Sequence, residues 1–208
     1  MARRSKEEAQ ETYQALLKAA ADLFMEKGVA PTTLQEIAER AGLTRGAVYW
    51  HFDGKEDIIT ALLSTYALPY IDQFETEIAQ LPRSSDAGRQ FRICIDRLMD
   101  NLINDERAGQ TMSISLHMAE FTSAETDFQA FLKDMHLSRY RALTETFSLL
   151  SDSSCLRGEL PPELYASGLF SYFLGLIHEH FSPHPVIDLR QSGRSLLGLY
   201  LDAILHIK

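Results

Sequence analysis

The sequence has few cysteines and no long apolar run, and both absences restrict the kind of protein it can encode. Its two cysteines, Cys94 and Cys155, are not spaced like a metal site or a disulfide framework. We therefore expect reduced thiols in a cytoplasmic protein, with a regulatory disulfide as the alternative. No stretch approaches the roughly 20 apolar residues needed to cross a bilayer, and the charged N-terminus does not resemble a signal peptide. No membrane partner is expected.

Positive charge is also scarce, which by itself argues against a nucleic-acid partner. The chain of 208 residues has 20 Lys and Arg against 29 Asp and Glu, a net charge of −9. Residues 1–55, however, contain eight basic and eight acidic residues, so the whole negative surplus lies in residues 56–208. An N-terminal segment without net charge can still bind DNA, although the rest of the chain is acidic, if its cations and helix N-termini face the same side.

Alternating β-branched runs are absent, and Gly and Pro lie mostly between segments with helical apolar periodicity. This pattern predicts an all-α fold of about nine helices. We expect a helix-turn-helix domain of three helices over residues 1–55 and a ligand-binding and dimerisation domain over 56–208. The boundary is expected inside a long fourth helix and not in a flexible linker. The predicted helices are 6–27, 34–40, 45–51, one beginning near 55, 86–104, 106–120, 124–151, 162–181 and 189–206.

Residues 33–52 predict a short helix, a tight turn and a second short helix. Thr33 and Glu36 match a capping box, and Thr44 is placed to cap the second helix. Gly42 supplies the left-handed backbone position that the turn needs. A helix pair of this geometry inserts its second helix into the major groove of DNA. An ordinary surface hairpin is the alternative that spacing alone leaves open.

The residues of the second short helix suggest individual roles. Arg45 is its only long cation, and a guanidinium fork matches guanine O6 and N7. Gly46 and Ala47 are small residues, which would let the helix backbone approach DNA closely. Trp50 and Phe52 are expected to lock the helix onto the core. The predicted DNA-contacting residues are Arg3, Arg4, Thr33, Thr44, Arg45, Gly46, Ala47, Tyr49, His51 and Lys55.

The residue types in the N-terminal segment resemble those of a known protein family. Ala19-Ala20-x-x-Leu23-Phe24-x-x-x-Gly28, Thr32-Thr33-Leu34-x-x-Ile37-Ala38 and the run 41–52 followed by Lys55 resemble the signature of the TetR family of bacterial repressors. Segments 2–12 and 44–52 resemble the AcrR and TtgR type, which represses multidrug efflux pumps of the resistance-nodulation-division type. Two departures reduce local positive charge: Tyr13 replaces the usual Arg, and Asp53-Gly54 precedes Lys55.

The resemblance implies a homodimer that binds a palindromic double-stranded operator and releases it when a hydrophobic small molecule binds. Apolar stripes over 164–181 and 196–204 suit a twofold interface through the last two helices, although they suit closure of a monomer core as well. One alternative function is a TetR-type regulator of a metabolic operon that answers a single endogenous ligand. Another is a small helical enzyme using His117 and Glu120.

The C-terminal helices are expected to enclose the effector site. Segment 112–121 stands where this branch carries His-x-x-Glu-Phe, and Ser113, His117 and Glu120 share one helical face. Neither cofactor nor metal is expected, since His178 and His180 would point about 200° apart on a helix. Met and aromatic side chains adapt to varied ligands, although each also suits plain core packing. The predicted pocket residues are Tyr66, Tyr70, Met99, Met112, Ser113, His117, Glu120, Met135, Phe170, Phe173 and Ile177.

Overall fold

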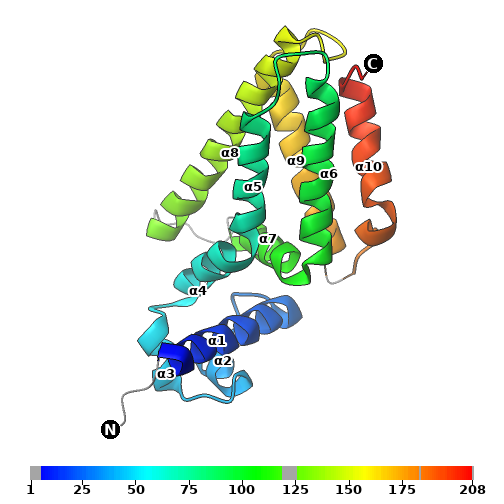
Figure 1. The fold of residues 1–208 in the computed structure, drawn as a ribbon. Helices are drawn as coiled ribbons and strands as arrows, with labels where there is room; N and C mark the ends of the chain where they lie inside the picture. The colour runs from blue at the N-terminus through cyan, green and yellow to red at the C-terminus, as the bar shows by residue number, and fades with distance from the viewer. Residues whose placement is uncertain (1–5, 119–125, 183, 208) are drawn as a thin grey trace.

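The computed structural model describes residues 6–118, 126–182 and 184–207, with the side chains of His117 and Met118 excepted. A small three-helix unit lies at the N-terminal end, and a larger bundle of long helices stands above it (Figure 1). Among the predicted site residues, Arg3, Arg4 and Glu120 lie outside the described residues, as does the side chain of His117.

The N-terminal unit consists of α1 (Lys6–Lys27), α2 (Leu34–Arg40) and α3 (Arg45–His51), at the bounds that the sequence predicts. α1 ends at Gly28, whose φ of +88° is a left-handed conformation that glycine adopts without steric cost. Leu16, Ile37 and Val48, one from each helix, are fully buried. The three helices therefore share a small apolar core.

A continuous helical segment runs from this unit into the bundle. It consists of α4 (Lys55–Leu62), a π-helical turn η1 (Leu63–Ala67) and α5 (Leu68–Ala79). Pro69 explains the wide turn, since it has no N–H and its ring would clash with the carbonyl of Thr65 in a regular α-helix. The amide of Leu68 instead donates to the carbonyl of Leu63, five residues back.

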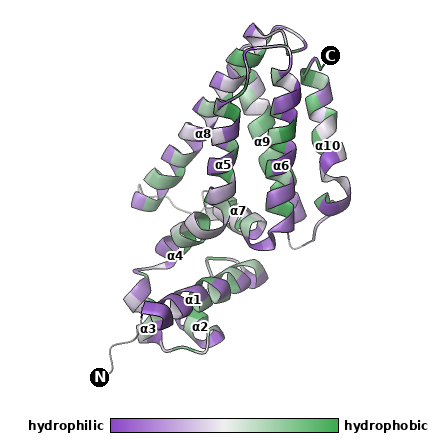
Figure 2. Ribbon diagram, viewed as in Figure 1, coloured by the Kyte–Doolittle hydropathy of each residue, from purple (hydrophilic) through white to green (hydrophobic). Residues whose placement is uncertain are grey.

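The bundle is completed by five further helices around an apolar core. They are α6 (Ala87–Asn104), α7 (Glu106–Met118), α8 (Asp127–Asp152), α9 (Pro162–His180) and α10 (Leu189–Ile204). α9 packs against α7, α8 and α10 and is coloured hydrophobic along most of its length (Figure 2). Counting α4–η1–α5 as one helix gives nine over the described residues, which contain no strand, so the predicted fold class is confirmed.

α7 lies at the base of the bundle, where it touches α1, α4 and η1 (Figure 1). Arg107 Nη1 lies 2.6 Å from Asp22 Oδ1 of α1, and the hydroxyl of Tyr66 in η1 donates to Gln14 Oε1 at 3.2 Å. These polar contacts join the bundle to the first helix of the N-terminal unit. A displacement of α7 or η1 would therefore bear directly on α1.

Two expectations from composition can be compared with this fold. Cys94 and Cys155 are both buried and unpaired, and burial together with nearby Glu77 raises the pKa of the Cys94 thiol to about 11. In the described ranges 6–118, 126–182 and 184–207, none of the helices combines the length and the apolar run that crossing a bilayer requires.

Candidate DNA-reading helix and effector pocket

α2 and α3 are fixed by the local bonds that the sequence predicts. Thr33 Oγ1 accepts from the Glu36 amide at 3.2 Å, and Glu36 Oε2 accepts from the Thr33 amide at 2.8 Å, which completes the capping box. Gly42 has φ +69°, and the hydroxyl of Thr44 accepts from the Ala47 amide at 3.3 Å. The angle between the helices is thus set by a glycine turn with capped helices on both sides.

α3 presents one face to the core and the other to solvent. Val48 and Phe52, four residues apart, are buried, whereas Arg45 and Tyr49 are exposed. The prediction that Trp50 locks α3 onto the core is wrong, because its side chain is 72% exposed. Two residues after Val48, Trp50 projects about 200° away from the buried side of the helix.

Arg45 and Tyr49 form a pair on the exposed face. Arg45 Nη2 donates to the Tyr49 hydroxyl at 2.9 Å, and the guanidinium carbon lies 5.3 Å from the centre of the Tyr49 ring. The pair fixes the direction of the only long cation on α3. The remaining guanidinium donors are left to reach a partner beyond the surface.

His51 and Lys55 lie at the side of this face and already have protein neighbours. The His51 ring contacts Trp50, with ring centres 4.4 Å apart, and Tyr13, at 5.7 Å. Lys55 Nζ donates to the carbonyls of Val29 and Ala30 at 2.8 and 2.9 Å, and burial lowers the pKa of this lysine. Lys55 therefore ties the loop before α2 to the start of α4.

Two other cationic side chains of the N-terminal unit form ion pairs. Arg40 makes two bonds of 2.7 Å to the carboxylate of Glu26. Lys27 Nζ lies 2.5 Å from Glu36 Oε1, and this contact, with the capping bonds from Thr33, lowers the pKa of Glu36 to about 2. Arg45, by contrast, has no acidic neighbour within ion-pair distance among the described residues.

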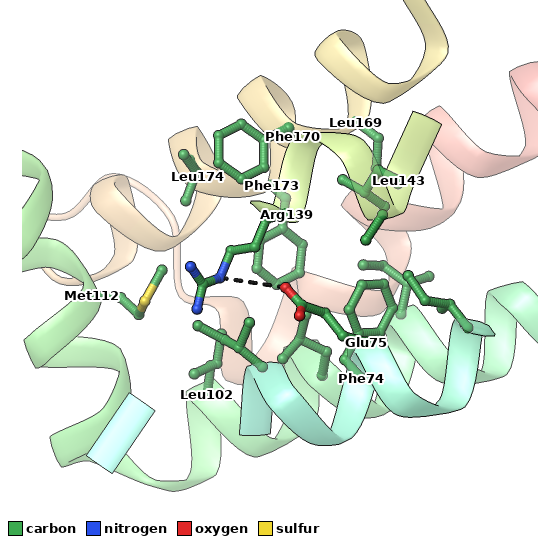
Figure 3. Close-up of a pocket in the computed structure, with 15 residues that line it drawn as sticks. Phe74, Glu75, Leu102, Met112, Arg139, Leu143, Leu169, Phe170, Phe173 and Leu174 are labelled. Atoms are coloured by element: carbon green, nitrogen blue, oxygen red, sulfur yellow. Dashed lines mark ion pairs between the residues drawn. The ribbon is translucent and has the colours of Figure 1, made fainter. Parts of the chain in front are cut away.

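A second candidate site lies inside the bundle. A cavity of about 60 Å³ opens between α5, α6, α8 and α9, with Met112 of α7 at one end (Figure 3). Its walls are apolar apart from one carboxylate and one guanidinium. The lining residues are Ile71, Phe74, Glu75, Ile78, Ile95, Leu98, Leu102, Met112, Arg139, Ala142, Leu143, Leu169, Phe170, Phe173 and Leu174.

Three of the predicted pocket residues, Met112, Phe170 and Phe173, line this cavity. Tyr66 lies instead at the junction with the N-terminal unit, and Tyr70 donates to Asp105, between α6 and α7, at 2.9 Å. The others with described side chains are buried but do not line the cavity. They are Met99, Ser113, Met135 and Ile177.

Sequence reasoning missed the two charged residues of the cavity, Glu75 and Arg139. They face each other from α5 and α8, with Arg139 Nε 3.8 Å from Glu75 Oε1 (Figure 3). A charged residue on the apolar side of an amphipathic helix is the signal that could have found them. Ile71, Phe74 and Ile78 set that side of α5, and Glu75 lies on it.

Comparison with known proteins identifies the family. Residues 16–62 match the model of bacterial regulatory proteins of the tetR family, and residues 88–206 match that of the C-terminal region of MAATS-type transcriptional repressors. The second match alone spans more than half of the chain. The chain belongs to the TetR family. The sequence prediction of a TetR-type transcriptional repressor is thereby confirmed.

TetR-family relatives cover nearly the whole chain. The transcriptional repressor BepR of Brucella suis is 49% identical over 205 residues, which are 97% of this chain and 96% of BepR. The regulator TtgR of Pseudomonas putida is 33% identical over 193 residues, 91% of this chain and 89% of TtgR. The solved complex of SmeT with triclosan gives a TM-score of 0.73 at 29% identity, covering 94% of this chain and 92% of SmeT.

The two family matches divide the TetR fold at the long helical segment. α2, the turn and α3 lie inside the first matched range, and most of the cavity wall lies inside the second. η1 and α5, which bring Phe74 and Glu75 to the cavity, fall between the two. The connection between the DNA-reading end and the pocket therefore lies outside both matched ranges.

Proposed function

We propose that this TetR-family protein represses a multidrug efflux operon and is released from its operator by hydrophobic small molecules. The observation that carries the proposal is the division of α3 into a buried side, with Val48 and Phe52, and an exposed side, with Arg45 and Tyr49. An exposed, directed guanidinium on a short helix is suited to reading guanine in the major groove.

The DNA contacts divide into base reading and backbone positioning. Arg45 reads a base, while Gly46 and Ala47 allow close approach. The exposed hydroxyls of Thr44 and Tyr49 are suited to bond phosphate oxygens, whereas the Thr33 hydroxyl would first have to leave Glu36 Oε2, to which it donates at 2.8 Å. For Lys55, contact with a phosphate requires that its ammonium leave the carbonyls of Val29 and Ala30.

The proposed dimer uses the outer faces of α9 and α10. Leu164 and Leu199 are 55% and 70% exposed there, although leucine side chains are usually buried. Gly175 of α9 is exposed, and a side chain added there would meet nothing within 4 Å, so it leaves room for close approach of a partner. A twofold partner packed on these faces would place two α3 helices on one side of a palindromic site.

The small size of the cavity suggests how a bound ligand would release the operator. An engineered cavity of about 150 Å³ binds benzene, so a drug-sized molecule enters a 60 Å³ cavity only if its walls move apart. α5 forms one wall and continues through η1 into α4, while α7 contacts α1. A ligand that favours the opened state would couple to operator affinity, typically by about 1–3 kcal/mol, or roughly 5–150-fold.

The assignment to an efflux operon is supported by a relative. SmeT is the repressor of the Stenotrophomonas maltophilia multidrug efflux pump SmeDEF, and the apolar cavity here suits hydrophobic compounds of varied shape. We also propose that the protein works in the cytoplasm, where its operator is, and acts by binding without catalysis. Turnover of a bound compound would revive the enzyme alternative.

A gel shift on the DNA upstream of the protein's own gene tests the proposal. The purified protein is expected to give a specific shift that several chemically unrelated dyes and antimicrobials reverse. Phe173→Ala is the informative variant because Phe173 lines the cavity far from α3, so it should change release and leave operator affinity unchanged. A shift that none of the compounds reverses would instead favour a regulator with one endogenous ligand.

A further inference from the structure

Glu75 and Arg139 are placed unusually for an ion pair. The 3.8 Å between Arg139 Nε and Glu75 Oε1 exceeds hydrogen-bond length, and both atoms are buried without a hydrogen-bond partner among the described residues. Arg139 Nη1, by contrast, donates to the Met135 carbonyl at 2.7 Å, which fixes the guanidinium. One acceptor and one donor therefore face the same space from opposite walls (Figure 3).

Such an arrangement costs free energy unless a third group completes it. A buried donor or acceptor without a partner loses its hydration and gains no bond. Two hydrogen bonds of about 2.8 Å can meet at a single oxygen over a separation of 3.8 Å. A hydroxyl donates to a carboxylate and accepts from an N–H at the same time. An ether or a carboxylate only accepts, and an ammonium only donates.

We propose that Glu75 and Arg139 form a clamp for the hydroxyl group of an uncharged aromatic effector. The proposal rests on the proposed function of the cavity as the effector site. The ring is suited to the neighbouring side chains of Phe74, Phe170 and Phe173, which line the same cavity. The effector class is therefore phenols and aryl alcohols.

Charge explains why an uncharged group is preferred over a cation. A cation bonded to Glu75 would also lie beside the Arg139 guanidinium, and a carboxylate bonded to Arg139 would lie beside Glu75. Burial raises the pKa of Glu75 and lowers the pKa of Arg139, and the carboxylates of Glu75 and Asp72 partly oppose the lowering at Arg139. An uncharged hydroxyl does not change the net charge of the pair, and its two hydrogen bonds replace the lost hydration of Glu75 and Arg139.

Equilibrium dialysis of the full-length protein with three matched probes tests the clamp. The probes are 4-phenylphenol, its methyl ether 4-methoxybiphenyl, and 4-(aminomethyl)biphenyl. A hydrogen bond to a charged group corresponds to roughly 10–100-fold in affinity. We expect 4-phenylphenol to bind more tightly than the ether by about this factor, and more tightly than the amine.

Glu75→Gln should reduce the preference for the phenol over the ether to a few-fold, because a Gln amide N–H can donate to an ether oxygen. Glu77→Gln is the matched control, since Glu77 lies on the same helix but pairs with Arg97 at 2.5 Å outside the cavity. It should keep the wild-type preference. Thermal unfolding of both variants verifies that they are folded.

Three results would overturn the clamp: equal binding of phenol and ether, tighter binding of the amine, or a preference unchanged in Glu75→Gln. Binding of none of the probes would reject the effector class. The gel shift distinguishes this failure from failure of the proposed function. Release of the operator by dyes, together with equal binding of the phenol and the ether, would keep the repressor while rejecting the clamp. A phenol preference without operator release would keep the clamp and reject the coupling.

Discussion

At the scale of single residues, Arg45 shows how a side chain can be directed before it meets its target. Its bond to Tyr49 and its position over the Tyr49 ring restrict the rotamers of a long, flexible cation. Less conformational entropy is then lost when the guanidinium bonds a base. In the proposed complex, Tyr49 would thus support base reading by Arg45, while its own hydroxyl would contact the DNA backbone.

Arg45→Ala should weaken binding to the specific operator by about 1–3 kcal/mol and relax base preference at one position of each half-site. Titration of the operator and of single-base variants by fluorescence anisotropy measures both effects. Arg89→Ala is the control, because Arg89 pairs with Asp86 in the bundle. Unchanged operator affinity in Arg45→Ala would remove its assigned role.

Gly42 is the residue at which the backbone itself limits the choice of side chain. Its φ of +69° lies in the left-handed region, so Gly42→Ala should lower the free energy of unfolding by about 1–2 kcal/mol. Gly46→Ala is the matched control, because Gly46 is helical and an added Cβ lies 3.8 Å from its nearest neighbour. Urea denaturation compares the two, and equal effects would contradict the strain argument.

At the scale of elements, the stability of α2 depends on the Glu36 carboxyl group, which is kept ionised. The Lys27 ammonium and the Thr33 groups lower the pKa of Glu36 to about 2, below its ordinary value of 4.5. Its stabilising contribution is therefore complete above about pH 4.5 and is lost as the pH falls toward 2.

Comparison of wild type with Glu36→Gln tests this pH dependence. Wild type should have the higher melting temperature at pH 7, and the difference should shrink progressively between pH 4.5 and 3. Glu39→Gln serves as the control, because Glu39 lies on the same helix and bonds only Gln35 among the described residues. A difference that grows on acidification would contradict the assigned sign.

The elements were largely predictable because their signals are local. The capping box at Thr33, the left-handed Gly42 and the cap at Thr44 each act within a few residues, and all three are confirmed. η1 was not predicted, because the apolar periodicity of a helix barely changes when one turn widens. Trp50 was wrongly placed because its apolar character was given more weight than its angular position on α3.

The cavity was less predictable because it depends on distant elements. Met112, Phe170 and Phe173 come from two helices, and Glu75 and Arg139 meet only when α5 packs beside α8. Met99 and Ile177 have the same apolar character but lie elsewhere in the core. No local pattern separates residues that line a cavity from residues that fill a core.

At the scale of the whole molecule, the proposed dimer leads to a further prediction. Leu199→Glu should raise the dimer dissociation constant more than tenfold, because it places a carboxylate where an apolar contact is expected. Sedimentation velocity measures the change, and operator affinity should fall with it. Val186→Glu, at an 88% exposed position before α10, should leave the dimer intact. A stable dimer in Leu199→Glu would place the interface elsewhere.

The π-helical turn η1 has a consequence for how this protein can change over generations. The extra residue of a π-helical turn can be lost without a large rotation of the following helix, but Pro69 would then lie in a regular α-helix, where its ring clashes with the carbonyl four residues back. Loss of one codon within residues 63–67 would therefore leave Phe74 and Glu75 on the side of α5 that faces the cavity, and its cost would arise at Pro69. A substitution of Pro69 would thus have to come before the deletion, so one residue preserves the wide turn in the descendants of this sequence.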